Sequence, residues 1–296
     1  MKIIDELLRT KNTKIKTVVV PCALDSHVLE SLELVRKEGF IKAILIADEI
    51  PLLKLMNELN ISSANYEVIN ESDIDRCLDI AMVMIEEKKA DFLMKGLVDT
   101  KLILKKVLDK KYHFRTEQRM THATLVESKY YHKPFLLSDA AMNINTSFET
   151  KKNIIQNGVK LLNTLGVKEP KVAILSAVEK VNEQLESTLI ASELKQLSGN
   201  ISVNHAIIDG PLQLDNALNK EAVLHKSIDS LVAGDADFLV MPNLEAGNIF
   251  YKSLMFLSDA SSASLVLGAT FPIIVTSRAD SVLTKYNSIR LAVLVS

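Results

Sequence analysis

Apolar residues in the first part of the chain follow two spacings in turn. Short uninterrupted apolar runs predict strands buried on both faces, at 16–21, 42–47, 66–69 and 91–94. Between these runs, apolar residues recur every three or four positions, which predicts amphipathic helices at 28–38, 51–59, 73–89 and 100–108. A regular alternation of strands and helices favours a mostly parallel sheet with helices on both faces.

The pattern changes in the middle of the chain. Two strand-like segments, 123–127 and 134–137, are separated by too few residues for a crossover helix, so they predict an antiparallel hairpin within the sheet. A helix over 150–165, with a stop at Gly166, resumes the alternation. Further strands are predicted at 171–175, 203–208, 238–241, 264–267 and 273–275.

Composition narrows the possible partners and the compartment. The 296 residues carry a net charge of −2, so no basic field attracts nucleic acid or a membrane surface, and an anionic ligand would need a local group of cations. The two cysteines suggest neither a disulfide framework nor a zinc site. No signal-peptide pattern or membrane-spanning apolar run is apparent, so we expect a cytoplasmic protein.

The most informative segment follows the predicted strand 273–275. It reads Thr-Ser-Arg-Ala-Asp-Ser and leads into a helical pattern, and such strand-to-helix turns are where open α/β sheets bind ligands. The guanidinium of Arg278 can bind two oxygens of a phosphate or carboxylate, beside the hydroxyl of Ser277. Asp280 could accept a proton, orient Arg278 or cap the helix. A solvated arginine at a polar helix start is an equally good interpretation of these residues alone.

A second candidate turn follows the predicted strand 91–94. Lys95 supplies a positive charge, Gly96 permits close approach of a ligand to the backbone, and Thr100 supplies a hydroxyl. The spacing is not that of a phosphate-binding Walker loop. An ordinary strand–turn–helix with a surface lysine is the commoner interpretation of this segment.

Other polar residues also follow or precede strands. Arg119 lies before the hairpin and Asn248 follows the predicted strand 238–241, so both are candidates for a shared cleft. Asp209-Gly-Pro211 is typical of a structural turn. The histidines have no metal-ligand spacing, and neither a dinucleotide-binding glycine motif nor a nucleophile elbow is present, so no metal site and no bound cofactor are predicted.

Taken together, these segments resemble the phosphate acetyltransferase/phosphate butyryltransferase family. The matching pieces run in order over roughly residues 15–295, at 90–96 with Thr100, 138–143, 170–175, 209–215, 234–237, 242–248 and 276–281. The pieces Met94-Lys-Gly96, Asp139-Ala-Ala-Met-Asn143 and Ser277-Arg-Ala-Asp-Ser281 look like the butyryl branch.

The resemblance implies a fold and a reaction. The fold is the two-domain α/β/α architecture of isocitrate and isopropylmalate dehydrogenases, with one domain from 1–144 plus 266–296, an inserted domain from 145–265, and a cleft between them. The reaction is reversible transfer of a short acyl group, butyryl or similar, between coenzyme A and phosphate, by direct attack of the thiolate on the acyl phosphate carbonyl. Coenzyme A is then a substrate, and a homodimer or an assembly of dimers is expected.

The resemblance also assigns roles to residues. Ser277 would contact the thiol or the acyl phosphate, and Arg278 and Arg119 would bind phosphate. Thr100 matches a hydroxyl near the acyl phosphate, and Lys95 stands where the acetyl enzymes have serine. Thr284 occupies the position of a candidate base, an aspartate, in the acetyl enzymes, which leaves Asp280 as the substitute base.

Three alternatives remain open. The first is a phosphate acetyltransferase with acetyl specificity. The second is a metal- and nicotinamide-dependent hydroxyacid dehydrogenase of the same architecture, although no carboxylate spacing for its metal is apparent. The third is a sensor that binds acyl-CoA or acyl phosphate without turnover.

Overall fold

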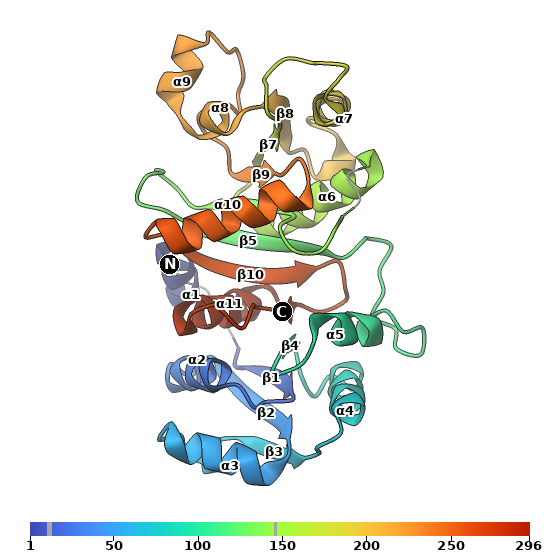
Figure 1. Ribbon diagram of the computed structural model, residues 1–296, viewed down its shortest axis with the longest axis vertical. Helices are drawn as coiled ribbons and strands as arrows, with labels where there is room; N and C mark the ends of the chain where they lie inside the picture. The colour runs from blue at the N-terminus through green and yellow to red at the C-terminus, as the bar shows by residue number, and fades with distance from the viewer. Residues whose placement is uncertain (11–13, 145–146) are drawn as a thin grey trace. The chain divides into compact units, whose positions relative to one another are not determined.

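The computed structural model describes residues 1–10, 14–144 and 147–296 (Figure 1). Packing divides the chain into two compact units, one made of 1–117 with 263–296 and the other of 118–262. The domain boundaries expected from the sequence, at 144/145 and 265/266, stay a prediction. The first of them adjoins residues 145 and 146, which lie outside the described residues.

The first unit is built on a mostly parallel sheet. Its strands stand in the order β3-β2-β1-β4-β11-β10, and neighbouring strands run parallel except for the antiparallel pair β10–β11. Their bounds are β1 (Lys16–Pro21), β2 (Ile41–Ala47), β3 (Glu67–Asn70), β4 (Phe92–Met94), β10 (Ser261–Leu267) and β11 (Ile273–Ile274).

Helices cover both faces of this sheet. They are α1 (Lys2–Thr10), α2 (Ser26–Lys37), α3 (Glu49–Glu58), α4 (Ile74–Glu86), α5 (Thr100–Val107) and α11 (Val282–Val295), with a 3-10 turn at Ser63–Asn65. Helices α1 and α2 pack with α11 on one side of the strands, and α4 and α5 pack together on the other (Figure 1). Val18, Val19 and Val20 are fully buried in succession, because both faces of β1 are covered.

The second unit contains the hairpin and a further parallel set. Its strands stand in the order β5-β6-β9-β7-β8, with β5–β6 antiparallel and the other pairs parallel. The elements are β5 (Thr121–Glu127), β6 (Phe135–Ser138), β7 (Lys171–Leu175), β8 (Ile207–Leu212), β9 (Phe238–Val240), α6 (Phe148–Thr164), α7 (Glu186–Lys195), α8 (Leu214–Leu218), α9 (Lys220–His225), α10 (Leu244–Leu257) and a 3-10 turn at Ile201–Val203.

The sequence prediction of an α/β class with a mostly parallel sheet is confirmed, as is the antiparallel hairpin. The predicted strand at 203–208 is wrong in its bounds. Residues 201–203 form a 3-10 turn, and β8 runs from Ile207 to Leu212, so Asp209-Gly-Pro211 lies within a strand although its composition is typical of a turn. Pro211 is compatible with a strand here because β8 stands last in the order, and an edge strand tolerates a missing N–H.

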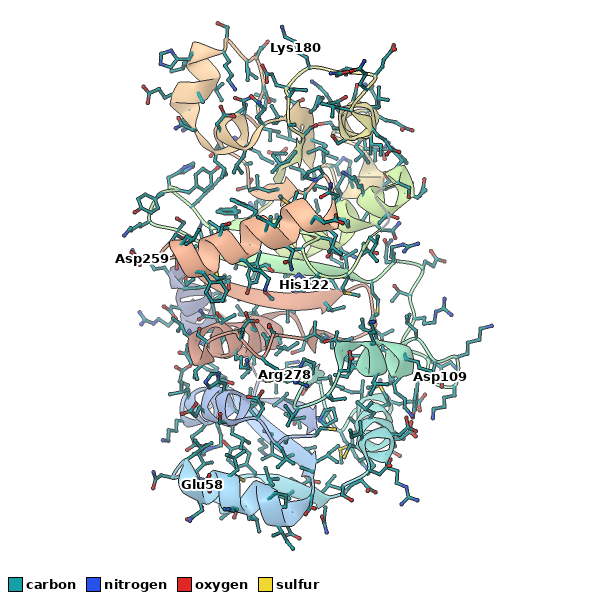
Figure 2. The ribbon with its side chains drawn as sticks, in the orientation of Figure 1. Glu58, Asp109, His122, Lys180, Asp259 and Arg278 are labelled. Carbon is teal, nitrogen blue, oxygen red and sulfur yellow. The ribbon has the colours of Figure 1, made fainter. Side chains whose placement is uncertain are left out.

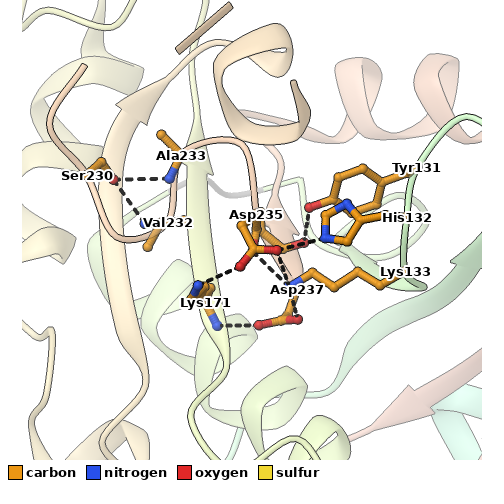
Figure 3. A network of polar contacts seen from close by, with 10 residues as sticks. Tyr131, His132, Lys133, Lys171, Ser230, Val232, Ala233, Asp235 and Asp237 are labelled. Carbon is orange, nitrogen blue, oxygen red and sulfur yellow. Dashed lines mark hydrogen bonds and ion pairs between the residues drawn. The ribbon is translucent and has the colours of Figure 1, made fainter. Parts of the chain in front are cut away.

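A charged network ties three strands of the second unit together at their amino ends (Figure 3). The Asp235 carboxylate, just before β9, accepts from Lys171 Nζ at 2.6 Å and from His132 Nε2 at 2.8 Å. Lys133, before β6, forms ion pairs with both Asp235 (3.1 Å) and Asp237 (2.6 Å). Burial opposes ionisation of Asp235, but the hydrogen bonds from Lys171, Lys133 and His132 outweigh it and lower its pKa.

Candidate active site

The turn between β11 and α11 is closed by its own side chains. The Asp280 carboxylate accepts a hydrogen bond from the Ser277 N–H at 2.6 Å, and the Asp280 N–H donates to the Ser277 carbonyl at 3.1 Å. Ser281, not Asp280, caps α11, because its hydroxyl accepts from the Thr284 N–H at 3.2 Å. The side chains of Ser277 and Arg278 are exposed, and Arg278 is labelled in Figure 2.

A buried lysine on α11 holds the backbone of this turn. Lys285 is 1% exposed, and its Nζ donates to the carbonyl oxygens of Ser277 at 2.9 Å and Asp280 at 3.1 Å. Burial lowers the pKa of Lys285, although Asp25 and Asp280 partly oppose this. Sequence analysis missed Lys285, and the available signal was its place four residues before Ile289, on an otherwise apolar face of the predicted helix.

The turn between β4 and α5 lies beside the first one at the same sheet edge. Strands β4 and β11 are parallel neighbours, with Met94 opposite Ile274, and the Lys95 N–H donates to the Ile274 carbonyl at 2.9 Å. A Cβ atom on Gly96 would lie 2.1 Å from the carbonyl oxygen of Cys22 at the end of β1, so only glycine fits there. Parallel pairing therefore brings together two turns that are far apart in the sequence.

Lys95 is also buried, at 7% exposure. Its Nζ donates to the carbonyl oxygens of Val98 at 3.3 Å and Gly96 at 3.5 Å. Burial lowers its pKa, with repulsion from Arg278 the next largest cause. The ion pairs among the described residues include neither Lys95 nor Lys285, whose Nζ atoms contact backbone carbonyl oxygens instead.

Two buried ammonium groups without carboxylate partners are unusual, because burying a charge costs free energy unless the charge is paired. Together with exposed Arg278, whose charge repels that of Lys95, they place three cations at the two turns, and the carboxylates of Asp25, Asp99 and Asp280 offset these charges only in part. Thr100, half-buried, begins α5 after its N-cap Asp99. The first unit therefore groups six of the predicted site residues in two adjacent turns suited to an anion: Lys95, Gly96, Thr100, Ser277, Arg278 and Asp280.

The other two predicted residues belong to the second unit. Arg119 is exposed, and its N–H donates to the Asn153 side chain at 2.9 Å. Asn248, on α10, donates through Nδ2 to the Ala140 carbonyl at 3.1 Å, and so supports the turn after β6. Their roles toward a substrate stay a prediction.

The turn after β6 in the second unit is fixed by a buried carboxylate. Asp139 accepts from the N–H groups of Ala141 and Met142, both at 2.9 Å, and from Asn143 Nδ2 at 2.6 Å. Gly247 lies against this turn, since a Cβ atom there would be 2.4 Å from the Asp139 carbonyl oxygen. The turn is thus a rigid structural feature at the carboxyl end of β6.

Lys151 is a further buried cation that sequence analysis missed. It is 2% exposed in the first turns of α6, its Nζ donates to the Met241 carbonyl at 3.2 Å, and burial lowers its pKa to about 8. The described residues hold no group of three or more His, Cys, Asp or Glu side chains that could bind a metal ion. Among the described helices, none has the length and apolarity needed to cross a membrane.

Comparison with known proteins gives consistent matches. The family model described as "Phosphate acetyl/butaryl transferase" matches residues 72–293. A phosphate butyryltransferase from Clostridium acetobutylicum is 36% identical over 98% of this chain and 96% of its own length. A phosphate acetyltransferase from Thermotoga maritima is 35% identical over 98% of both chains.

The fold also has a close counterpart among solved structures. A branched-chain phosphotransacylase from Enterococcus faecalis V583 superposes with a TM-score of 0.86 and 29% identity, over 95% of this chain and 98% of that one. The isocitrate dehydrogenase-like fold class expected from the sequence is therefore confirmed.

Proposed function

Because the chain belongs to the phosphate acetyl/butyryl transferase family, we propose that it moves a short acyl group, butyryl or a similar one, reversibly between coenzyme A and inorganic phosphate. The observation that supports this most is the grouping of three cations, Lys95, Lys285 and Arg278, at the two adjacent turns, with buried Lys95 and Lys285 lacking a carboxylate as an ion-pair partner among the described residues. An acyl phosphate presents a dianion to such a site, and preorganised cations stabilise the charge that develops as phosphate leaves.

Each residue of the two turns then has a role. The planar guanidinium of Arg278 binds two phosphoryl oxygens at once, and Lys95 contributes a second positive charge from the neighbouring turn. Ser277 contacts the thiol or the acyl phosphate through its hydroxyl in this proposal, and its backbone is held in place by Asp280 at the N–H and by Lys285 at the carbonyl oxygen. Thr100 lies beside the acyl phosphate in this proposal, and no covalent enzyme intermediate is required if both substrates are held in line.

Arg119 and Asn248 extend the proposed site. In this proposal Arg119 supplies a second guanidinium to the phosphate, as the family resemblance implies. We propose that coenzyme A and acyl phosphate bind as substrates, with no resident cofactor. A homodimer or an assembly of dimers, in the cytoplasm, completes the proposal.

Butyryl preference is the finer part of the proposal. It is supported by the C. acetobutylicum relative and by Lys95, which stands where the acetyl enzymes have serine. The T. maritima acetyl enzyme is almost equally similar, so acyl length needs a direct measurement. One or two methylenes change selectivity by about 1–3 kcal/mol, which is within reach of small pocket differences.

The test is a turnover assay with purified protein. Thioester formation would be followed on mixing coenzyme A with acetyl, propionyl, butyryl and isobutyryl phosphates in parallel. We expect product with all short chains and the highest kcat/KM for a four-carbon acyl group. Highest activity on acetyl phosphate would instead favour a phosphate acetyltransferase. Binding without turnover of any acyl phosphate would contradict an enzymatic function and favour a sensor.

A further inference from the structure

The backbone of Arg119 is held on both sides by asparagine side chains. Arg119 lies two residues before β5 begins at Thr121, and its side chain is exposed. Its N–H donates to Asn153 Oδ1 at 2.9 Å, and its carbonyl oxygen accepts from Asn157 Nδ2, also at 2.9 Å. Both backbone polar groups of an exposed residue outside any strand are therefore paired with side chains of α6, although water can satisfy such groups at a surface.

The spacing of the two asparagines matches this task. Asn153 and Asn157 are four residues apart on α6, so they lie one above the other on the same face of the helix. An amide side chain offers one oxygen that accepts and one NH2 group that donates. Asparagine is also a poor residue for a helix interior, so the formation of α6 by itself does not favour this pair.

Each amide group is fixed by a further contact of its own. Asn153 Nδ2 donates to the Glu149 carbonyl oxygen at 2.7 Å, which leaves Oδ1 for the Arg119 N–H. Asn157 is 7% exposed, and its Nδ2 also donates to the Thr121 hydroxyl at 2.9 Å. The two asparagines are thus already oriented for Arg119, and they do not have to reorder when they bind its backbone.

The residue after Arg119 is tied to a different part of the second unit. Asn143 Nδ2 donates to the carbonyl oxygen of buried Met120 at 3.0 Å and to the Asp139 carboxylate at 2.6 Å. Asp139 fixes the rigid turn after β6, as its contacts with the N–H groups of that turn show. The short segment that carries Arg119 is therefore anchored both to α6 and to this turn.

Ser277 in the first unit is held in a comparable way. Its N–H donates to the Asp280 carboxylate at 2.6 Å, and its carbonyl oxygen accepts from Lys285 Nζ at 2.9 Å. In both units, a residue with an exposed side chain has its N–H and its carbonyl oxygen bound by other side chains. Both Ser277 and Arg119 are residues to which the proposed function gives a contact with substrate.

We propose that Asn153 and Asn157 are positioning residues, which hold Arg119 so that its guanidinium meets the phosphoryl group of the acyl phosphate. This inference rests on the proposed function and on the role of Arg119 in it. An arginine side chain has several rotatable bonds, so the guanidinium is placed reproducibly only when the backbone that carries it is fixed. Neither asparagine touches the substrate, and both act through Arg119.

The first test removes one asparagine contact at a time. Asn153→Leu removes the acceptor of the Arg119 N–H, and Asn157→Asp removes the donor to its carbonyl oxygen. Each should lower kcat/KM for butyryl phosphate by about tenfold or more, while the KM for coenzyme A changes by less than about twofold. The matched control is Gln156→Leu, which removes a 2.9 Å contact between the same helix and the Ser202 carbonyl oxygen. A loss of the same size in the control, or an equal effect on both substrates, would overturn the proposal.

A double-mutant cycle separates positioning from general damage to the fold. If Asn153 acts through Arg119, Asn153→Leu should lower kcat/KM by less than about twofold when residue 119 is already changed by Arg119→Ala. The measurement is steady-state kinetics of wild type, the two single variants and the double variant. Damage to the fold would lower kcat/KM by the same factor in both backgrounds, and that result would overturn the positioning role.

Aspartate should be tolerated at one position and not at the other. Asn153→Asp retains an oxygen for the Arg119 N–H, so most activity should survive, whereas Asn157→Asp has no N–H for the Arg119 carbonyl oxygen. Equal losses in the two variants would overturn the role of these contacts. If the buried Asn157→Asp change prevents folding, the half-buried position 153 carries the comparison through Asn153→Asp and Asn153→Leu. Equal losses in that pair would overturn the proposal as well.

The proposed function itself is read from separate outcomes. A wild-type protein that turns over no acyl phosphate would overturn the proposed function. Arg119→Ala with wild-type kinetics would remove Arg119 from the site, and the positioning role with it. A loss in Arg119→Ala, with none in Asn153→Leu or Asn157→Asp, would overturn the positioning role alone and leave the proposed function standing.

Discussion

The Nζ atom of Lys285 lies 2.9 Å from the carbonyl oxygen of Ser277. A helix residue thereby fixes the turn that precedes its own helix, and it does so with a positive charge that is 1% exposed. The charge costs folding free energy through desolvation. The buried Lys285 ammonium therefore lowers the folding free energy available to the protein while it fixes the turn that carries exposed Ser277 and Arg278. Such a cost is typical of functional sites, where local structure is kept at the expense of stability.

Replacing Lys285 by methionine should separate the desolvation cost of the buried charge from its role in fixing the turn. The Lys285→Met protein should be as stable as wild type or slightly more so, because an unpaired buried charge is removed. Its kcat/KM should nevertheless fall at least tenfold, since Ser277 and Asp280 lose a shared donor. Thermal unfolding and steady-state kinetics, measured together, check this. A variant with wild-type kcat/KM would show that the turn holds its conformation without Lys285.

Removal of the guanidinium at position 278 should affect activity far more than stability. Arg278→Ala should lower kcat/KM by about a hundredfold to a thousandfold, the usual loss for one donor to a developing anion. The exposed position predicts a change in unfolding free energy within about 0.5 kcal/mol. Arg76→Ala, an exposed arginine on α4, is the control and should leave kinetics unchanged. Equal kinetics in the two variants would remove Arg278 from the site.

Substitutions at Asp280 should distinguish a base from a structural acceptor. Asp280→Asn retains an oxygen that can accept from the Ser277 N–H, so most activity and the pH profile of kcat should survive. Asp280→Ala removes the acceptor and should lower kcat/KM and loosen the turn. The measurement is kcat against pH for both variants. Loss of the same magnitude in Asn and Ala variants would instead assign the base to Asp280.

Lys151 should give the protein a stability that rises with pH. Its pKa is about 8 in the folded protein and 10.5 is its ordinary value, so the unfolded chain binds more protons between these pH values. Stability is therefore reduced below about pH 8 and recovered by about pH 10.5. Lys151→Met should stabilise the protein by about 3 kcal/mol at neutral pH, with the gain disappearing toward pH 10.5.

Denaturant unfolding at several pH values checks this expectation. Lys160→Met, an exposed change on the same helix, should show no such pH-dependent difference from wild type. A Lys151→Met variant less stable than wild type at neutral pH would mean that the contact with Met241 outweighs the cost of burying the charge.

The Asp235 network should make the free energy of unfolding fall as the pH is lowered into the acid range. Its folded pKa is lowered, so its contribution is present above the unfolded value of about 3.9 and is lost as pH falls below it. Asp235→Asn should destabilise the protein near neutral pH, with the difference from wild type shrinking in acid. Asp259→Asn, an exposed carboxylate paired with Lys129, is the control for acid sensitivity in general. Parallel pH curves for wild type and Asp235→Asn would contradict the role of the network.

The sequence was sufficient for elements whose pattern is local. Strand β1 has an unbroken apolar run because both of its faces are covered, and the hairpin β5–β6 has a connection too short for a helix. The turn of Ser277, Arg278 and Asp280 was recognisable because a polar cluster follows an apolar strand. The bounds of strand β8 were wrong because Gly210-Pro211 is typical of turns, and the sequence does not show that β8 stands last in the sheet order, where a proline is tolerated.

The tertiary structure decided which residues share a site and which charges are buried. The adjacency of Lys95 and the Ser277 turn depends on β4 pairing with β11 across most of the sequence, which local spacing cannot encode. Lys285 and Lys151 look like surface lysines in the sequence, and burial alone lowers their pKa values. Local propensity and periodicity determine which segments form helices and strands. The burial of a charge and its distance from other charges depend on atoms that are far apart in the sequence and that only folding brings together.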